Sequence, residues 1–463
     1  MTVQALSDAL FAIGRRYPRI PLETIRRLPL PLLHRLRQPG LRRTFADAAR
    51  APYYREAFAA AGVDPRRARR PEDLGGFFLP ADVIKTRPES LLCAEPDLAI
   101  ESSGTSGRVS RVYLSHGELE YAARQGGLLL ALLGLARGDR LLCTLDYGWG
   151  LGALLLERGV RHTPLFAMVP GRVDPVDAYE RLRTYGFDVL VSDPFWLARL
   201  TEIARDRGRP RPLKLICAGG EGITARARAE LERFWDAPLC MTYASTEAAT
   251  VLGFECRERN GYHVNEFDFH VEVVEADADG YGEIVLTTVH RRVMPLVRYR
   301  TGDVARWVDG PCRCGLPFRR LSPIRGRVDE QVSCAWGNLS PDFFERLLAG
   351  VPGLGADWQV ALYERELKPV VQFRLEVGDP GTVESLPARE RAVRTIVESL
   401  ERQHPAAWLA YRQRLIDVEF CFFDAGRLRQ ARKLRRLVDE RERGLPAWLA
   451  SAAATLRPAG SGA

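Results

Sequence analysis

From about residue 141 the chain alternates short apolar runs with longer stretches of helical spacing, and this alternation restricts the fold more than any other feature. The apolar runs include RLLCTL, DVLVS and LKLICAGG, and the stretches between them include PVDAYERLRTYG and TARARAELERFW. A short apolar run suits a buried strand, whereas apolar residues three and four apart suit one face of a helix. The pattern therefore predicts an α/β domain with a largely parallel sheet.

The rest of the chain divides around this segment. The first hundred residues have helical spacing, as in LRRTFADAARAPYYREAFAAAGV. From about Tyr262 the runs HVEVVEA and GEIVLTTV predict an antiparallel or barrel-like piece. Beyond SPIRGRVDEQVSCAWGNLSP, strand alternation in VALYERELKPVVQFRLEV, helical spacing in PARERAVRTIVESLERQ and a strand at DVEFCFF predict a small α+β unit. We expect a large domain over 1–328, a small domain over 329–445 and a disordered tail over 446–463.

Length and charge exclude several classes of protein. A chain of 463 residues is expected to form two or more domains. The net charge of +8 does not indicate nucleic acid, because only four of the 67 basic residues are lysine and the arginines are scattered among acids; a basic stripe over 427–436 is the alternative. The longest apolar run, 126–136, is too short for a membrane span. With no recognisable secretory signal, we expect a cytoplasmic protein.

The stretch IESSGTSGRVSRVYLS crowds hydroxyl and glycine residues before a strand-like run. Small residues let backbone N–H groups converge on an anion, and hydroxyls add further donors. The stretch therefore predicts a phosphate-binding loop, or alternatively a solvated turn. The candidate phosphate ligands are Ser102, Ser103, Gly104, Thr105, Ser106, Gly107 and Arg108.

Five further motifs follow in order along the chain: GGEGIT, YASTE, MPLVRYRTGDVARW, IRGRVDE and RKLRRLVDER. As an ordered set they resemble the adenylate-forming superfamily, most closely its phenylacetate–coenzyme A ligase family, over about residues 41–440. The resemblance implies a large N-terminal domain of parallel sheets, helices and a barrel-like piece, with a small mobile α+β C-terminal domain. It also implies that ATP activates an aryl or fatty carboxylic acid to acyl-AMP, that pyrophosphate leaves, and that the acyl group passes to the thiol of coenzyme A.

The same resemblance implies roles for the matching residues. The Ser/Gly loop, with Thr105 as a catalytic member, would hold the pyrophosphate, and Glu247 would ligate Mg²⁺. Asp303 would accept hydrogen bonds from the ribose, and Arg327 would reach the same nucleotide. The nucleotide would also be flanked by Gly219, Gly220, Glu221, Tyr243, Ala244, Ser245 and Thr246.

Each of these residues also has a purely structural interpretation. Glu247 could begin a helix, where an acid favours the dipole, and Asp303 could be a turn residue beside a glycine. Tyr243 could be part of the core. The ordered set, rather than any single motif, favours the functional interpretation.

Lys433 stands out because arginine replaces lysine almost everywhere else. A compact ammonium can insert between a carboxylate and an α-phosphate, where a planar guanidinium fits differently. The family has its catalytic lysine in a Lys-x-x-Arg-x-x-Asp pattern, which Lys433, Arg436 and Asp439 match; a solvated charged helix is the alternative. The resemblance also places at Asp329 the hinge about which the small domain would turn between two orientations.

The resemblance places the acyl pocket near LDYGWG and DPFW. Tyr147, Trp149 and Phe195 would form aromatic walls for a flat or apolar acid, with Ala244 at the floor; alternatively the rings only pack the core. The chain departs from the family pattern at Ala244, where glycine is common, and in GGEGIT, which lacks the usual proline. These departures leave the acid and the acceptor open.

CRERNGYH and GPCRCG supply three thiols and an imidazole, a ligand set suited to a closed tetrahedral zinc site. The predicted ligands are Cys256, His263, Cys312 and Cys314. Because the two segments flank the predicted antiparallel strands, they could meet in space. The alternative is two unrelated loops with buried cysteines.

Two other functions stay open. SSGTSGRVSRV and LPADVIKTR also resemble acyl-protein synthetases, so the acyl group could pass to a cysteine such as Cys217, Cys334 or Cys421, to a carrier-protein phosphopantetheine or to an amine. The chain could instead be a non-catalytic basic binding protein with a decayed site. The number of subunits, including a homodimer, stays open.

Overall fold

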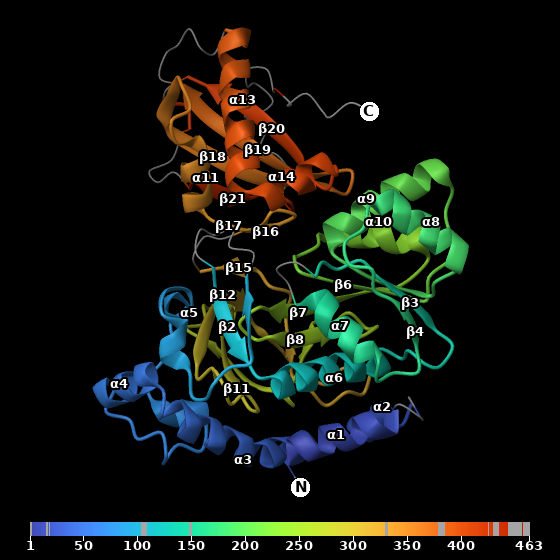
Figure 1. Ribbon diagram of the computed structural model, residues 1–463, viewed down its shortest axis with the longest axis vertical. Coiled ribbons are helices and arrows are strands. Elements are labelled where there is room, and N and C mark those ends of the chain that lie inside the picture. Colours follow the sequence, from blue (N-terminus) through green and yellow to red (C-terminus); the bar gives the residue numbers. More distant parts are fainter. Residues whose placement is uncertain are drawn as a thin grey trace.

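A nine-stranded mixed sheet forms the centre of the large domain (Figure 1), in the strand order β13-β14-β9-β8-β7-β6-β5-β3-β4. The structure is a computed structural model. It describes residues 2–14, 17, 19–102, 109–147, 151–328, 332–377, 385–424, 426–428, 435–442 and 456.

The predicted alternation of parallel strands and helices is confirmed. The elements are β3 (Arg140–Cys143), α7 (Gly152–Val160), β4 (Phe166–Met168), α8 (Pro175–Tyr185), β5 (Val189–Ser192), α9 (Pro194–Arg207), β6 (Leu215–Gly219), α10 (Ala225–Trp235) and β7 (Leu239–Ser245). Strands β5 and β6 are buried at every residue, as parallel strands usually are. Because carboxyl ends of parallel strands meet at one edge, the loops after β5, β6 and β7 share that edge.

The antiparallel piece predicted after Tyr262 is also confirmed. The nine-stranded sheet continues antiparallel through β8 (Thr250–Glu255), β9 (Tyr262–Val264), β14 (Arg320–Leu321) and β13 (Trp307–Val308). A second, four-stranded antiparallel sheet consists of β10 (Phe269–Val274), β11 (Gly282–Thr288), β12 (Tyr299–Ala305) and β15 (Gly326–Arg327). A separate hairpin, β1 (Leu98–Glu101) and β2 (Arg111–Leu114), leads into α6 (His116–Leu132).

The N-terminal segment is helical, as predicted. In Figure 1 its first helices run along the lower side of the large domain and its later ones lie on the left. It contains α1 (Val3–Gly14), α2 (Arg19–Arg26), α3 (Leu30–Ala48), α4 (Pro52–Ala60), η1 (Pro71–Leu74), α5 (Ala81–Thr86) and η2 (Pro88–Leu91).

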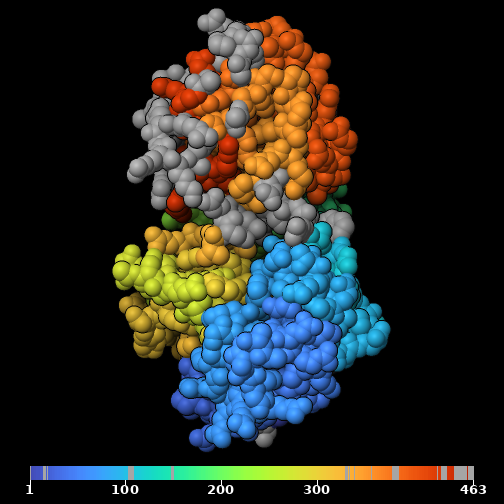
Figure 2. All heavy atoms as spheres, turned by 90° about the vertical axis from the view of Figure 1, so that its left-hand side faces the viewer, coloured from blue at the N-terminus to red at the C-terminus, as the bar shows by residue number. Residues whose placement is uncertain are grey.

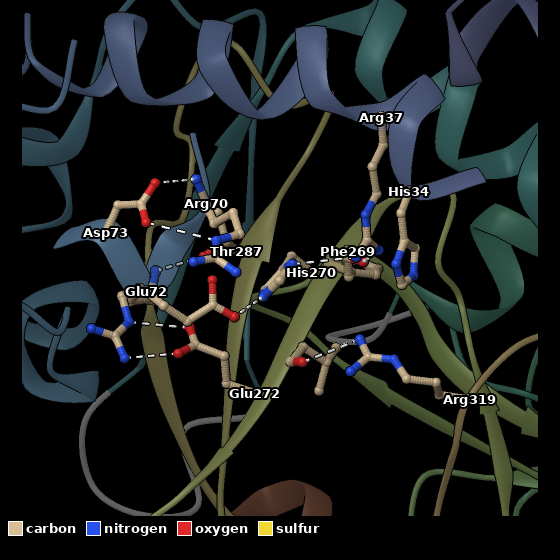
Figure 3. A network of polar contacts seen from close by, with 12 residues as sticks. His34, Arg37, Arg70, Glu72, Asp73, Phe269, His270, Glu272, Thr287 and Arg319 are labelled. Atoms are coloured by element: carbon tan, nitrogen blue, oxygen red, sulfur yellow. Dashed lines mark hydrogen bonds and ion pairs between the residues drawn. The ribbon is translucent and has the colours of Figure 1, made fainter. Parts of the chain in front are cut away.

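A buried polar network attaches α3 to the second sheet, and Figure 3 shows His34 and Arg37 directed from this helix toward β10. Arg37 donates 3.0 Å hydrogen bonds to Glu266 Oε2 and to the carbonyl of Phe269. The fully buried Glu266 also contacts His34 at 2.5 Å and Arg319 at 2.7 Å. Removing one partner of a buried ion pair typically costs about 3–5 kcal/mol, so this network fixes the helix on the sheet.

The small domain has the predicted α+β composition. It contains β16 (Val332–Cys334), β17 (Gly337–Leu339), α11 (Pro341–Leu348), β18 (Leu354–Arg365), β19 (Lys368–Val377), α13 (Leu386–Gln403), α14 (Pro405–Arg412), β20 (Asp417–Phe423) and β21 (Leu437–Asp439). The stretch 360–377, with its continuous strand alternation, is a hairpin rather than one strand. Glu366 and Leu367 form the turn with φ of 48° and 71°, the positive values that a two-residue hairpin turn requires. Such turns usually contain asparagine or glycine, so the pair Glu-Leu did not indicate one in the sequence.

The small domain is seated on one end of the large domain (Figures 1 and 2). The tip of the β18–β19 hairpin reaches the large domain, where Lys368 Nζ lies 3.8 Å from Glu202 Oε1 of α9. Almost all of the predicted tail lies outside the described residues; Leu456, which is described, pairs with Phe420 of β20 through two 2.9 Å backbone hydrogen bonds. None of the helices in the described ranges is long and apolar enough to cross a membrane.

Candidate functional site

Two residues predicted to bind a nucleotide, Tyr243 and Arg327, both contact the carboxylate of a third, Asp303. Asp303 of β12 lies opposite Arg327 of β15, and Tyr243 approaches from β7 in the other sheet. Tyr243 Oη donates a 2.6 Å hydrogen bond to Asp303 Oδ2, and Arg327 Nη1 donates a 2.6 Å hydrogen bond to Oδ1. Gly302 makes room for this pair, because a Cβ there would lie 2.7 Å from Arg327 Nη2. The cluster therefore joins the two sheets.

The cluster is buried and polar. Burial raises the pKa of Asp303, and the Arg327 guanidinium opposes this rise. Burial also raises the pKa of Tyr243 well above its ordinary value, so its hydroxyl stays a donor to Asp303 at neutral pH. Each carboxylate oxygen has a second lone pair, so Asp303 can accept a further hydrogen bond from a ligand hydroxyl.

Glu247 lies near this cluster, in the turn between β7 and β8. The turn is closed by hydrogen bonds from the backbone N–H of Ala248 to Ser245 Oγ (3.1 Å) and of Ala249 to the Thr246 carbonyl (3.0 Å). The half-buried Glu247 carboxylate is close enough to add to the rise in the Asp303 pKa. One such carboxylate fits Mg²⁺, which binds few protein oxygens and keeps phosphate oxygens.

The predicted phosphate loop is described only at its base. Ser102 and Ser110 close the β1–β2 hairpin with backbone and side-chain hydrogen bonds of 3.0 and 2.9 Å. Nine predicted residues lie outside the described part of the chain: Ser103, Gly104, Thr105, Ser106, Gly107, Arg108, Trp149, Asp329 and Lys433. Their predicted roles stay predictions.

The Gly219–Glu221 segment leaves β6 at the same edge of the sheet. Only glycine fits at position 219, because a Cβ there would lie 2.3 Å from Thr242 Oγ1. Gly220 has φ of 93°, and a Cβ there would lie 2.8 Å from Asp193 Oδ1. Burial raises the pKa of Glu221 to about 8, and its Oε2 has no hydrogen-bond partner among the residues that the structure describes. Arg441 of the small domain, whose charge opposes this rise, therefore lies close to Glu221.

The described acyl-pocket candidates lie at different depths. Phe195, the second residue of α9, is 8% exposed, whereas Tyr147 is 41% exposed and donates to the carbonyl of Val169. Arg172 stacks over the Phe195 ring at 5.1 Å and forms an ion pair with Asp193. The sequence interpretation did not find this ion pair: Asp193 is the first residue of the DPFW motif, but no recognised motif contains Arg172.

The four predicted metal ligands converge. Their donor atoms all lie within 4.8 Å of one another, with Cys256 Sγ 3.6 Å from Cys312 Sγ and Cys314 Sγ 3.3 Å from His263 Nε2. These distances are much longer than a disulfide bond and match the edges of a tetrahedron of sulfur and nitrogen around zinc. The backbone N–H of Leu316 donates to Cys314 Sγ at 3.4 Å, and hydrogen bonding from Cys314 lowers the pKa of Cys256. The donor set and its geometry thus fit zinc.

The chain is similar in sequence to known enzymes that bind AMP or act as coenzyme A ligases. A family model described as AMP-binding enzyme matches residues 89–278. A phenylacetate–coenzyme A ligase of Thermus thermophilus is 29% identical over 371 residues, covering 76% of this chain and 83% of the relative. A second ligase of that name, from Pseudomonas putida, is 25% identical over 342 residues, covering 70% of this chain and 77% of the relative.

The fold is similar to that of a 2-hydroxyisobutyryl-CoA ligase solved in several states. Its complex with 2-HIB-AMP and CoA in the thioesterification state gives a TM-score of 0.76 at 17% identity, covering 90% of this chain and 91% of that one. Its postadenylation state in complex with 2-HIB-AMP gives a TM-score of 0.61, with 89% and 91% covered.

Proposed function

Because the chain belongs to the adenylate-forming, or AMP-binding, superfamily of enzymes, in the branch of the acid–CoA ligases, we propose that it activates a carboxylic acid with ATP and transfers the acyl group to coenzyme A. The observation that carries this proposal is the convergence of Tyr243 and Arg327 on Asp303, with Glu247 close by. Tyr243 and Glu247 share one motif, and Asp303 and Arg327 come from two others on the second sheet. Together they are the residues that a nucleotide and its metal would need.

The chemistry has two balanced steps. In the first, an oxygen of the acid attacks the α-phosphorus of ATP and pyrophosphate leaves, which yields acyl-AMP. In the second, the thiolate of coenzyme A attacks the acyl carbonyl and AMP leaves. Asp303 would hold the ribose in both steps, and Glu247 would place the Mg²⁺ that neutralises the phosphates.

The acid proposed is an aryl or fatty carboxylic acid. The pocket would lie at the carboxyl edge of the parallel strands, with Phe195, Tyr147 and Ala244 near it. An aromatic wall suits a flat or apolar acyl group. The Arg172–Asp193 ion pair beside Phe195 adds a polar group to this region.

Coenzyme A, rather than a cysteine of this chain, is the proposed acceptor. Cys217, Cys334 and Cys421 are all buried. Burial raises the pKa of Cys334 to about 12 and raises that of Cys217 further. A buried thiol held protonated is a poor nucleophile, so Cys217 and Cys334 do not suit acyl transfer, and burial keeps Cys421 from a substrate. A carrier-protein phosphopantetheine is the second candidate.

We propose further that the small domain turns about a hinge at residue 329. We also propose that its orientation in this structure is the one in which the thioester forms. Support comes from the higher TM-score with the thioesterification state of the hydroxyisobutyryl ligase. The hairpin contacts with α9 and the approach of Arg441 to Glu221 belong to this orientation.

We also propose that Cys256, His263, Cys312 and Cys314 hold a structural zinc ion. Four protein ligands would leave no open position for a substrate, so the ion would stabilise the loops rather than take part in the reaction. Arg320, which is 2% exposed, donates to the carbonyls of Asn260, Asp309 and Gly310 and so ties the two loops together.

Pyrophosphate exchange over a panel of aryl and fatty acids tests the proposal, followed by acyl-CoA formation with the acids that support exchange. We expect exchange that depends on acid and Mg²⁺. Exchange without acyl-CoA formation would point to a different acceptor. No exchange with any acid, together with no binding of ATP, would favour a non-catalytic binding protein with a decayed site.

A further inference from the structure

The buried side chain of Arg291 holds the turn that carries Glu247. Arg291 lies between β11 and β12 and is 7% exposed. Its Nη1 donates a 2.6 Å hydrogen bond to the carbonyl of Glu247, and its Nη2 donates to the carbonyl of Ala248. One planar fork thus binds two successive carbonyls, which a single ammonium cannot do in the same geometry.

Glu118, in the first turn of α6, holds the segment of Arg291 from the other side. Its Oε1 accepts hydrogen bonds from the backbone N–H of Arg292 (2.5 Å) and Val293 (3.1 Å). Its Oε2 accepts from the backbone N–H (2.7 Å) and the hydroxyl (3.1 Å) of Ser115. Ser115 directly follows β2, so one carboxylate connects the β1–β2 hairpin to the Arg291 segment.

From these contacts we propose that Glu118 and Arg291 form a brace that sets the position of Glu247 relative to the β1–β2 hairpin. Arg291 is then a positioning residue for the reaction, and it acts through Glu247 rather than by touching the nucleotide. The inference rests on the proposed function, in which the hairpin loop holds phosphate and Glu247 holds the metal. Displacement of a bound group by about 1 Å can cost a factor of about 10² in rate, so such a brace matters to catalysis.

The surroundings of Arg291 suit this role. Burial lowers its pKa to about 10, while the charges of Glu118, Tyr54, Asp268 and Glu247 oppose the change. The guanidinium therefore stays charged at neutral pH, and a hydrogen bond from a charged donor is stronger than one between neutral groups.

Arg291→Lys tests the brace, because lysine keeps the charge and loses the fork. We expect the Mg²⁺ concentration for half-maximal pyrophosphate exchange to rise about 10-fold, with the KM for the acid changed less than about 2-fold. Arg292→Lys is the matched control, since the side chain of Arg292 binds Asp47 at 3.2 Å and should leave the Mg²⁺ dependence unchanged.

Glu118→Gln tests the part of the brace formed by Glu118. Both carboxylate oxygens of Glu118 accept hydrogen bonds from backbone N–H groups, and in glutamine one of these oxygens is replaced by an NH₂ group, which donates. We expect the same direction of change in Mg²⁺ dependence. Glu120→Gln, two residues along α6, is its control, because the Glu120 carboxylate pairs with His162 at 2.5 Å rather than with the Arg291 segment. If Arg291→Lys folds poorly, Glu118→Gln still tests the brace, provided that its thermal unfolding midpoint equals that of the wild type.

Hydrogen exchange of peptides covering 245–250, measured without nucleotide, tests the brace independently of activity. We expect faster exchange in Arg291→Lys and Glu118→Gln than in the two controls. Unchanged exchange in both would overturn the brace even if the wild-type enzyme were inactive. Faster exchange with unchanged Mg²⁺ dependence would overturn the positioning role. Absence of pyrophosphate exchange in the wild type would instead overturn the proposed function.

Discussion

Thr224 Oγ1 of the large domain donates a 3.0 Å hydrogen bond to Oε2 of Glu364 in the small domain. Thr224 caps the N-terminus of α10, and Glu364 lies at the tip of the β18–β19 hairpin, where Leu367 is only 3% exposed. Together with the Lys368–Glu202 contact, this hydrogen bond holds the hairpin against α9 and α10. The contact links residues 140 positions apart, so it depends on how the two domains are oriented.

Glu364→Ala should weaken this orientation. A partly buried charged contact of this kind is worth about 1 kcal/mol, so we expect acyl-CoA formation to fall about 3- to 10-fold relative to pyrophosphate exchange. Glu366→Ala, at the same turn but exposed, is the control. The ratio of the two half-reactions measures the effect, and an equal loss of both would argue against a role in domain orientation.

Asp303→Asn should reduce pyrophosphate exchange about 10²-fold, because it removes the charge that pairs with Arg327 and an acceptor for the ribose. Asp309→Asn, an exposed aspartate six residues along, should have no effect. Steady-state kinetics in ATP and in the acid separate the two substrates, and we expect the larger change for ATP. Wild-type kinetics in the Asp303 variant would remove Asp303 from the site.

The buried carboxyl of Glu221 should make the free energy of unfolding fall as pH rises. Burial raises its pKa to about 8 in the folded protein, from about 4.5 in the unfolded chain, so the folded state binds more protons between these values. Its contribution to stability is therefore full below pH 4.5 and is lost as pH rises through 8. Glu221→Gln cannot titrate, so its thermal midpoint should decline less than that of the wild type from pH 5 to pH 8.5. Parallel curves would contradict the raised pKa.

The protein should purify with about one equivalent of zinc, and a strong chelator should lower its thermal midpoint. Cys256→Ser should lower the zinc content and the midpoint together, because it removes one ligand of the cluster. Cys93→Ser is the control, since Cys93 lies outside the cluster. Elemental analysis and thermal unfolding measure the two quantities. A metal-free wild type of unchanged stability after chelation would rule out the site.

Lys433→Ala should abolish pyrophosphate exchange or nearly so, since contacts to charge that develops in a transition state are typically worth a factor of about 10² or more. Lys85→Ala, which removes another of the four lysines, should keep full activity. The comparison uses initial rates at saturating ATP and acid. Full activity in the Lys433 variant would assign the role to another residue.

Much of the candidate site could be predicted from the sequence because its residues lie in short ordered motifs. Tyr243, Asp303 and Arg327 were each matched to a motif, and the structure brings them into hydrogen-bond contact. Arg291 and Glu118 could not be found in this way. The contacts that form the brace are to backbone N–H and carbonyl groups of distant segments, and a backbone group leaves no trace in the sequence of its partner.

The sequence by itself determined the order of strands and helices, because apolar periodicity is a local property that survives without knowledge of the fold. It also supplied four zinc-type ligands, although only the folded structure brought Cys256 and His263 next to Cys312 and Cys314. The turn at Glu366 and Leu367, the partners of Glu364 and the raised pKa of Glu221 were likewise decided by tertiary structure. Burial and contact between distant segments arise only when the chain packs, and these set hydrogen-bond partners and proton affinities.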